Sequence, residues 1–217
     1  MRRPAAHNTA GLTFRAAMRA DVADAVPLIY SSGPAAFDYV FNIGAIRDAP
    51  AFLRFAYLHG GGEFGWQSHR VAEIGGQVVA AGAAYDGRLT LRFTLAGALQ
   101  ILAFYGPIRA WGVMIRGLRT ETVIRPPRAE EYYLCHLGVR EESRGQGIGA
   151  HFMRHLLAGM DAKRHRCAAL DVAITNPRAK LLYERLGFAV DALRPSKLQN
   201  RHGRVADHYR MSRPVGK

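Results

Sequence analysis

The chain of 217 residues is 49% hydrophobic and 22% charged, a balance that excludes an intrinsically disordered protein and predicts one globular domain over residues 1–217. Its most apolar stretch, residues 93–108, is interrupted by Gln100 and by Gly106-Pro107, so no transmembrane helix is expected. The formal net charge of +13 indicates attraction to an anionic partner, although arginines spread along a chain can also reflect composition alone.

The first half of the chain alternates between strand-like and helical patterns. In chain order we expect a strand at 12–16, helices at 22–30, 35–40 and 51–59, and two strands at 69–74 and 77–85. The last two strands are joined by Gly75-Gly76, a dipeptide suited to a two-residue hairpin turn. The run Gly60-Gly61-Gly62 ends the third helix.

Residues 88–128 are apolar, compatible with helices, and interrupted by Gly106-Pro107. We expect two helices packed as a hairpin, inserted before the central strand and covering one side of the sheet. Docking on a membrane is an alternative, because Arg109, Arg116 and Arg119 interrupt the apolar stretch. These arginines do not form one clean face, so a lid or the surface of a homodimer is the favoured interpretation.

The second half begins with a strand at 131–139 that is apolar on both faces, as in the centre of a buried sheet. A glycine-rich loop and a helix from about 148 to 162 follow it. The remaining elements are a strand at 167–174, a helix at 177–186, a strand at 188–193 and an edge or terminal strand at 205–212. This order predicts a mixed α/β sheet with helices on its faces.

Two further features bear on the cellular compartment. The basic start at residues 1–4 is not followed by a continuous apolar run, so we expect no signal peptide. Cys135 and Cys167 are each flanked by apolar residues, which favours small buried side chains over a disulfide. A reducing compartment, the cytoplasm, is therefore the expected location.

The loop at 144–150 carries the clearest chemical signal. Gly145, Gly147 and Gly149 let backbone N–H groups approach a ligand, and the following helix adds the unpaired N–H groups of its first turn. With the charge of Arg144 beside them, these groups predict a pyrophosphate site. A Walker loop would need Gly-Lys-Ser/Thr at the end of this segment, and the dinucleotide fingerprint would need another glycine spacing.

The loop fits the pattern Q/R-x-x-G-x-G/A instead, and residues 176–188 read N-P-R-A-K-L-L-Y-E-R-L-G-F. Both segments resemble motifs of the GNAT acetyltransferase superfamily, the second being N-x-x-A-x-x-L-Y-E-x-x-G-F. The resemblance is strong over 130–193 and weak over 12–85. It implies a mixed, mostly antiparallel central sheet flanked by helices, with acetyl-CoA as co-substrate bound by the core at 130–193.

The resemblance also implies roles for single residues. Tyr183 corresponds to the tyrosine that protonates the departing thiolate. The alternative is a purely structural role, in which its ring packs on the sheet. Asn176 contacts the coenzyme, caps its helix, or does both. The implied coenzyme-binding residues are Leu137, Gly138, Val139, Arg144, Gly145, Gln146, Gly147, Ile148, Gly149, Ala150, Asn176 and Tyr183.

The general base is less well defined. Strand alternation places Tyr133, Cys135 and Leu137 on one face of the central strand, and His136 on the other, unless a β-bulge re-aims it. The position where relatives carry an acid or histidine is thus occupied by Tyr133 or Cys135. We consider His136, and Glu131 with Glu130 at the start of the strand, as candidates. No metal is expected, because the histidines show no ligand spacing with Cys or Asp.

The acceptor is expected to be an amine, small or peptidic, attacked directly on the thioester. Phe37-Asp38-Tyr39 could supply an aromatic wall and a carboxylate for a cationic amine, and otherwise represents two core aromatics around a solvated acid. Nucleic acid is disfavoured as a partner because no helix-turn-helix pattern is evident. The alternative function is a CoA-binding sensor or adaptor without catalysis, since no standard base is apparent.

Overall fold

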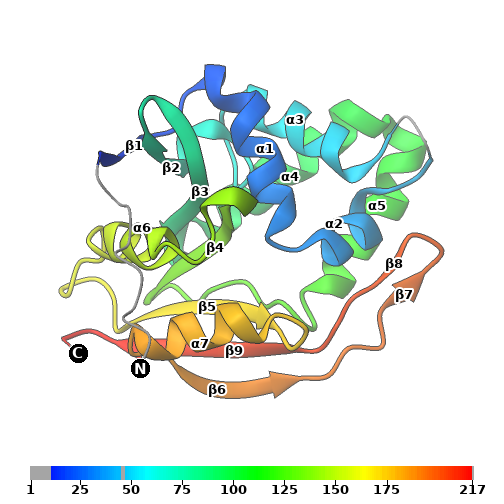
Figure 1. Ribbon diagram of the computed structural model, residues 1–217. Helices are drawn as coiled ribbons and strands as arrows, with labels where there is room; N and C mark the ends of the chain where they lie inside the picture. Colours follow the sequence, from blue (N-terminus) through cyan, green and yellow to red (C-terminus); the bar gives the residue numbers. More distant parts are fainter. Residues whose placement is uncertain (1–10, 45–46, 217) are drawn as a thin grey trace.

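The computed structural model describes residues 11–44 and 47–216 (Figure 1). Its centre is a seven-stranded sheet in the order β1-β2-β3-β4-β5-β9-β6. The strands are β1 (Leu12–Ala16), β2 (His69–Ile74), β3 (Gln77–Asp86), β4 (Glu131–Val139), β5 (Cys167–Ala173), β6 (Ala189–Arg194) and β9 (His208–Pro214). Every neighbouring pair is antiparallel except β4 and β5. The predicted mixed, mostly antiparallel sheet is confirmed.

Seven α-helices in the described chain surround this sheet. They are α1 (Val22–Ser31), α2 (Pro34–Phe41), α3 (Ala49–His59), α4 (Thr90–Tyr105), α5 (Pro107–Thr120), α6 (Ile148–Leu157) and α7 (Pro177–Arg185). Short 3₁₀ turns lie at Arg19–Asp21, Trp66–Ser68, Gly87–Leu89 and Glu141–Ser143, and a separate ribbon pairs β7 (Gln199–Asn200) with β8 (Gly203–Arg204). Helix starts follow local chemistry: the Asp48 carboxylate accepts a hydrogen bond from the Ala51 amide at 2.8 Å, which caps α3.

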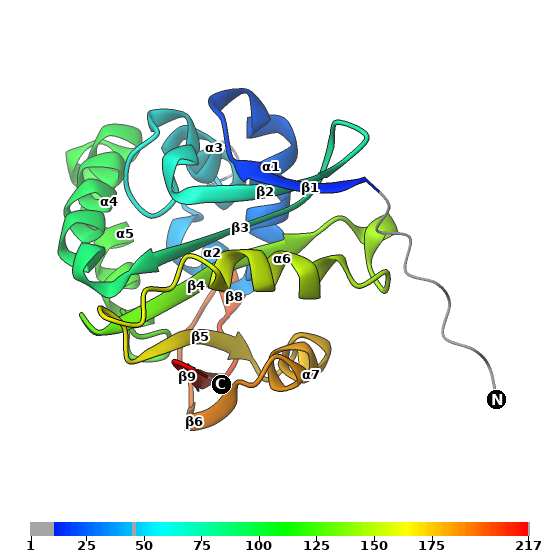
Figure 2. The same cartoon turned by 90° about the vertical axis from the view of Figure 1, so that its left-hand side faces the viewer.

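The helices form layers on both faces of the sheet (Figure 2). On one face, α1 to α5 enclose a core rich in aromatic side chains, with Phe52 and Tyr57 fully buried. On the other face, α6 packs on β1, β3 and β4 through an apolar stripe that includes Ile148 and Phe152. The stripe recurs at the spacing of an amphipathic helix, so the sequence pattern directs this packing.

The insertion is a helical hairpin as expected, but its position differs from the expectation. The hydroxyl of Tyr105 donates to the Phe41 carbonyl at 2.7 Å, and Arg116 Nε donates to the Val40 carbonyl at 2.9 Å. Both contacts tie α4 and α5 to α2. The hairpin therefore extends the helical layer, and it approaches the sheet mainly where Phe93 meets the edge of the Tyr85 ring, at 4.9 Å between centroids.

The last strand, expected at an edge or as the terminal strand, is the terminal strand β9; the edge alternative is wrong, because β9 lies between β5 and β6. The strand carries a buried charge: Arg210 is 6% exposed and makes ion pairs with Asp171 and Glu131. Paired charges can be buried where single ones cannot. α6 is also shorter than predicted: it ends at Leu157, and the amides of Gly159 and Met160 bond three residues back.

Cys135 and Cys167 are both free. Among the described residues, no helix combines the length and the apolar character that crossing a bilayer requires. The segment 1–4, on which the expectation of no signal peptide depends, lies outside the described residues.

Candidate active site

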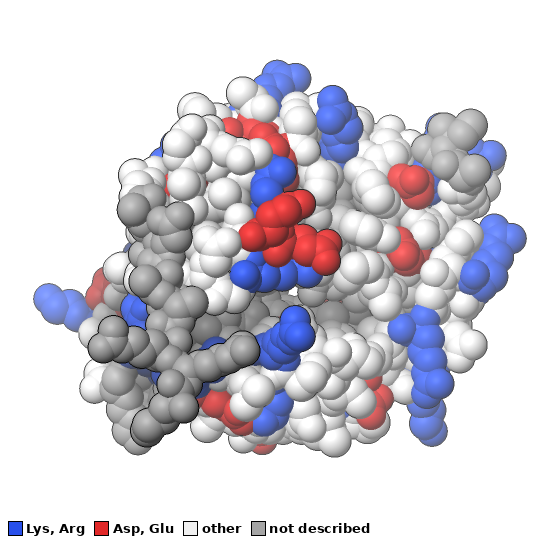
Figure 3. All heavy atoms as spheres, in the orientation of Figure 1, with Lys and Arg blue, Asp and Glu red and all other residues white. Residues whose placement is uncertain are grey.

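One large cavity, about 1560 Å³ in volume, extends from the glycine-rich loop to the α4–α5 hairpin. Its walls come from β4, β5, the start of α6, α7 and helices of the opposite layer. Figure 3 shows that one face of the molecule is hollowed near its centre, with Lys and Arg side chains at the rim and Asp and Glu side chains beside them on one side. Basic groups at the entrance favour an anionic ligand.

The floor of this cavity is a slot between β4 and β5. The two strands pair only where Glu131–Tyr133 lies beside Cys167–Ala169, and then they separate. From Leu134 to Val139, the β4 edge that faces β5 has no strand partner in the described chain; one carbonyl, that of Val139, accepts a hydrogen bond from Arg144 Nε at 3.0 Å. A backbone edge with unpaired groups can bind an extended polar ligand as a further strand would.

The glycine-rich loop closes one end of the slot. Gly145 and Gly147 have φ of 78° and 82°, a left-handed conformation that favours glycine, and α6 starts at the next residue, Ile148. The first amides that bond within the helix are those of Ala150 and His151, so the amides of Ile148 and Gly149 have no partner among the described residues. These N–H groups, at the positive end of the helix dipole, form an anion-binding cradle.

Not all predicted coenzyme residues face the cavity. Gln146 donates its side-chain amide to the Glu142 carbonyl at 3.1 Å, which braces the loop from outside. Gly138 lines the cavity, but a Cβ there would lie 2.0 Å from the Leu28 carbonyl oxygen. Glycine at 138 therefore allows α1 to pack directly on β4.

α7 contributes the two residues named from the second motif, and both line the cavity. The Asn176 side chain caps the helix by accepting a hydrogen bond from the Ala179 amide at 3.1 Å. Tyr183 is 8% exposed, and burial raises its pKa to about 12. Its hydroxyl is therefore a proton-bearing donor at neutral pH, and it makes no hydrogen bond within the described chain.

A β-bulge in β4 changes which side chains share a face. The register with β3 shifts between Ala81 and Ala83, and His136 has φ of 58°, the one positive φ at a non-glycine position in the described chain. The His136 ring lies 5.1 Å from that of Phe64 in the helical layer, whereas Leu137 packs with the α6 core. Cys135 packs with Tyr133 and lies near His136, so its predicted shared face with Leu137 is wrong, and the bulge aims His136 into the cavity.

His136 belongs to a row of three titratable groups, in which it is hydrogen-bonded to His69 and lies at ion-pair distance from Glu63. His69 Nδ1 lies 2.9 Å from the Gly65 carbonyl, which can only accept, so this nitrogen carries the proton. Burial lowers the pKa of His69 to about 4, which leaves its Nε2 as an acceptor for His136 Nδ1 at 3.3 Å. By the same logic His136 Nε2 holds a lone pair, and burial together with His69 keeps the pKa of His136 well below its usual range.

The third group is Glu63, which follows the triple-glycine segment and was missed from the sequence. Its carboxylate lies 3.7 Å from His136 Nε2. The side chain is 33% exposed, and its accessible part faces the cavity. Burial raises the pKa of Glu63 to about 7, while the Tyr85 hydroxyl opposes this rise and Glu121 adds to it. An acid with this pKa can exchange a proton at neutral pH.

Glu63, Cys135 and His136 each present a ligand atom within 4.8 Å of the others. This mixed set could hold a transition metal, although no sequence spacing indicated it. Burial and Glu63 both raise the pKa of the Cys135 thiol well above its ordinary value, so the sulfur is protonated in this environment.

Glu131 is engaged elsewhere. It pairs with Arg210, which also binds Asp171 at 2.7 Å, and Asp171 in turn accepts a hydrogen bond from the Tyr133 hydroxyl at 2.9 Å. Glu131 does not line the cavity, and the Glu130 carbonyl accepts a bond from the Arg166 amide. The geometry thus gives these acids a structural role at the closed end of the β4–β5 pair.

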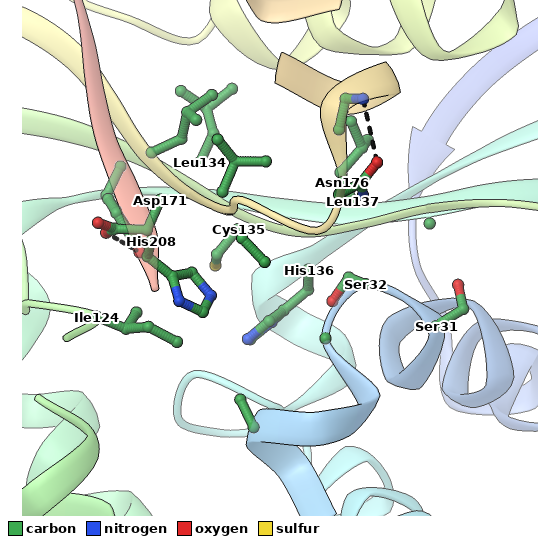
Figure 4. Close-up of a pocket in the computed structure, with 18 of the residues that line it drawn as sticks. Ser31, Ser32, Ile124, Leu134, Cys135, His136, Leu137, Asp171, Asn176 and His208 are labelled. Atoms are coloured by element: carbon green, nitrogen blue, oxygen red, sulfur yellow. Dashed lines mark hydrogen bonds between the residues drawn. The ribbon is translucent and has the colours of Figure 1, made fainter. Parts of the chain in front are cut away.

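Of the three residues expected to bind the acceptor, only one lines the cavity. Phe37 lines the cavity, whereas Asp38 accepts from the Tyr30 hydroxyl at 3.0 Å and Tyr39 lies in the core. A residue that the sequence did not single out, His208 of β9, extends into the same space as His136 (Figure 4). Its Nδ1 lies 2.8 Å from the Ala206 carbonyl, which leaves Nε2 as an acceptor.

A model of the Acetyltransferase (GNAT) family matches residues 45–188. The chain belongs to this family. Among curated sequences, the 5-NmdU N-acetyltransferase of Pseudomonas phage PaMx11 is 40% identical over 63 residues, which are 29% of this chain and 43% of the phage enzyme. The chain thus matches less than half of that relative's length.

Solved structures share the GNAT fold. An N-acetyltransferase from Staphylococcus aureus Mu50 superposes with a TM-score of 0.68 at 19% identity, over 92% of this chain and 99% of that one. The structure of yncA from Salmonella typhimurium, described with its cofactor acetyl-CoA, gives a TM-score of 0.52 at 17% identity, over 95% of each chain. At these identities the likeness concerns the fold alone.

Proposed function

We propose that this GNAT protein is an N-acetyltransferase, which moves an acetyl group from acetyl-CoA to an amine by direct attack. The observation that carries the proposal is the unpaired β4 edge, because it joins two sites in one cavity. The anion-binding loop lies at one end, and the pair Glu63–His136 lies beside the bulge. The N-acetyltransferase name of the phage relative and the acetyl-CoA of the Salmonella structure support the same reaction.

The donor would bind along the slot. Its pyrophosphate accepts hydrogen bonds from the amides of Ile148 and Gly149, next to Arg144, and its pantetheine arm pairs with β4. Gln146 acts indirectly by bracing the loop. We assign to the coenzyme site Leu137, Gly138, Val139, Arg144, Gly145, Gly147, Ile148, Gly149, Ala150, Asn176 and Tyr183, all of which line the cavity.

Glu63 and His136 would prepare the acceptor. An alkylammonium ion must lose a proton before it attacks, because its pKa of about 10.4 keeps it charged at neutral pH. Glu63 attracts this cation and takes the proton, while the lone pair on His136 Nε2 accepts a hydrogen bond from the amine. His136 thus keeps its proposed catalytic place, and Glu63 replaces Glu131 as the acid of this site.

The chemical step then balances without a further reactant. The amine nitrogen forms a bond to the acetyl carbon, and N–H groups on the free edge of β4 stabilise the developing oxyanion. The bond to sulfur breaks, Tyr183 supplies a proton to the thiolate, and the nitrogen loses its second proton to restore the tyrosine. The products are the acetamide, free CoA and one proton from the ammonium ion.

The acceptor would be an amine with an apolar substituent, either a small molecule or part of a peptide. The cavity beyond the bulge is lined by apolar and aromatic side chains, including Phe37, Phe64 and Phe93, and its carboxylates include Glu63 and Glu121. Such a site stabilises an ammonium ion by charge and its substituent by burial.

Thiol release in the presence of acetyl-CoA and a panel of primary amines tests the proposal. We expect turnover with at least one amine, and calorimetric binding of acetyl-CoA that weakens when Gly147 is replaced by valine. Binding of acetyl-CoA without turnover on any amine would point to the alternative, a CoA-binding sensor or adaptor. Turnover with longer acyl-CoA donors but not with acetyl-CoA would overturn the donor assignment.

A further inference from the structure

The outer face of the α4–α5 hairpin is apolar although it faces solvent. Leu91, Leu95 and Leu99 recur every four residues along α4 and are 71%, 59% and 68% exposed. On α5, Ile108 and Trp111 are 91% and 70% exposed. The inner face of the hairpin is already occupied, because it packs on α2 and α3. A helix that is apolar on both faces requires a second partner.

The charged residues within the α4–α5 hairpin are of one sign, and the acids Asp86 and Glu121 flank it at its two ends. From Gly87 to Thr120 the chain contains five arginines and no Asp or Glu. Arg92, Arg109 and Arg119 are exposed, whereas Arg116 donates to the Val40 carbonyl and belongs to the fold. A symmetric contact between two copies of this face would bring the same positive charges together. An anionic surface complements them instead.

We propose that the outer face of α4–α5 docks on an anionic lipid bilayer. α4 is 16 residues long, and at 1.5 Å per residue it extends about 24 Å, so it lies along the membrane plane with its leucines in the acyl boundary. Trp111 lies at the interface and the exposed arginines reach the head groups. Gly97, Ile101 and Leu118 of the same hairpin line the cavity, so docking brings the wall of the cavity to the lipid surface.

Vesicles of phosphatidylcholine, with and without phosphatidylglycerol, test this docking. The chain has two tryptophans, Trp66 and Trp111, and Trp66 is partly buried in the helical core. We expect the protein to sediment with the anionic vesicles only, to be released by salt, and to show a blue shift of emission that Trp111→Phe abolishes. The double variant Leu95→Glu/Leu99→Glu should bind the anionic vesicles at least about tenfold more weakly than the unchanged protein.

The matched control is Leu193→Glu, which adds a charge at another exposed leucine, on β6 and 53% exposed. It should sediment like the unchanged protein, and circular dichroism should show all variants folded. The proposal is overturned if the unchanged protein ignores anionic vesicles, or if the double variant binds them equally well. A dimer that dissociates in the double variant, without vesicle binding, would show that a second copy covers this face.

Discussion

His136 Nδ1 lies 3.3 Å from His69 Nε2, although the two residues are 67 positions apart in the chain. This contact fixes the His136 tautomer and turns its lone pair toward Glu63. It also gives a reason for the left-handed backbone at His136, a conformation that costs on the order of 1–3 kcal/mol at a non-glycine residue. The bulge and the buried His69 together hold this ring in the cavity.

Replacing Glu63 by glutamine should remove a step in the pH profile. Because burial raises its pKa to about 7, Glu63 is protonated below pH 7 and ionised above it. For the unchanged protein we expect kcat/KM to rise as the pH passes about 7 and then to level off. For Glu63→Gln we expect a kcat/KM about 10²-fold lower that does not rise through this range. Glu184→Gln on the exposed side of α7 is the control and should retain the profile.

The same carboxyl group links stability to pH. Its pKa rises from 4.5, the ordinary value of a solvated glutamate, to about 7 in the folded chain, so the folded state binds the proton more tightly. Its contribution to the free energy of unfolding is complete below about pH 4.5 and is lost as the pH rises through 7. Urea titrations across this range should show a smaller decrease for Glu63→Gln than for the unchanged protein.

Tyr183→Phe should slow turnover without weakening donor binding. The hydroxyl has no partner in the described chain and is held protonated by burial, so its loss removes a proton donor and little packing. We expect kcat to fall about 10²-fold while calorimetry gives an unchanged Kd for acetyl-CoA. Tyr209→Phe is the comparison, and equal turnover in Tyr183→Phe and the unchanged protein would contradict the proton-donor role.

Gly138→Ala should destabilise the fold strongly. The added Cβ would lie 2.0 Å from the Leu28 carbonyl, and neither α1 nor β4 can move without disturbing the core. We expect a loss of about 3 kcal/mol or more in a denaturant titration. Gly97→Ala in α4 adds the same methyl group where nothing lies within 4 Å. It should raise the free energy of unfolding, by less than about 1 kcal/mol.

Arg210→Met should cost about 3–5 kcal/mol, because it leaves the buried carboxylate of Asp171 without its counter-charge. Since Glu131 pairs with the same arginine, Glu131→Gln should lower the melting temperature while leaving kcat unchanged. A large loss of kcat in a fully folded Glu131→Gln protein would restore Glu131 as a base candidate.

The sequence predicted local geometry well where one pattern dominated. The glycines at 145 and 147 and the cap at Asn176 appear as their chemistry requires, and the strand at 131–139 has the predicted bounds. These features depend on neighbours in the chain. The hairpin within residues 88–128 was also recognisable, because Gly106 and Pro107 suit a helix end and a helix start, and the structure has them as the end of α4 and the first residue of α5.

The side chains that face the proposed acceptor site could not be predicted in the same way. Alternation along β4 assumes a regular strand, and the bulge that re-aims His136 is a property of its pairing with β3. Glu63 and His69 reach His136 only through the fold, and no spacing along the chain relates them. A signal for Glu63 did exist: an acid directly after three glycines, where the backbone can approach a site closely.

The position of β9 has a consequence for synthesis on the ribosome. β5 pairs with β4 at three positions but with β9 at seven, and in the described chain β6 pairs with β9 alone. The β5 wall of the proposed coenzyme slot thus lacks its main partner until residues 208–214 have left the exit tunnel. Nascent chains stalled before that point should fail to bind acetyl-CoA, although the loop at 144–150 has long been translated.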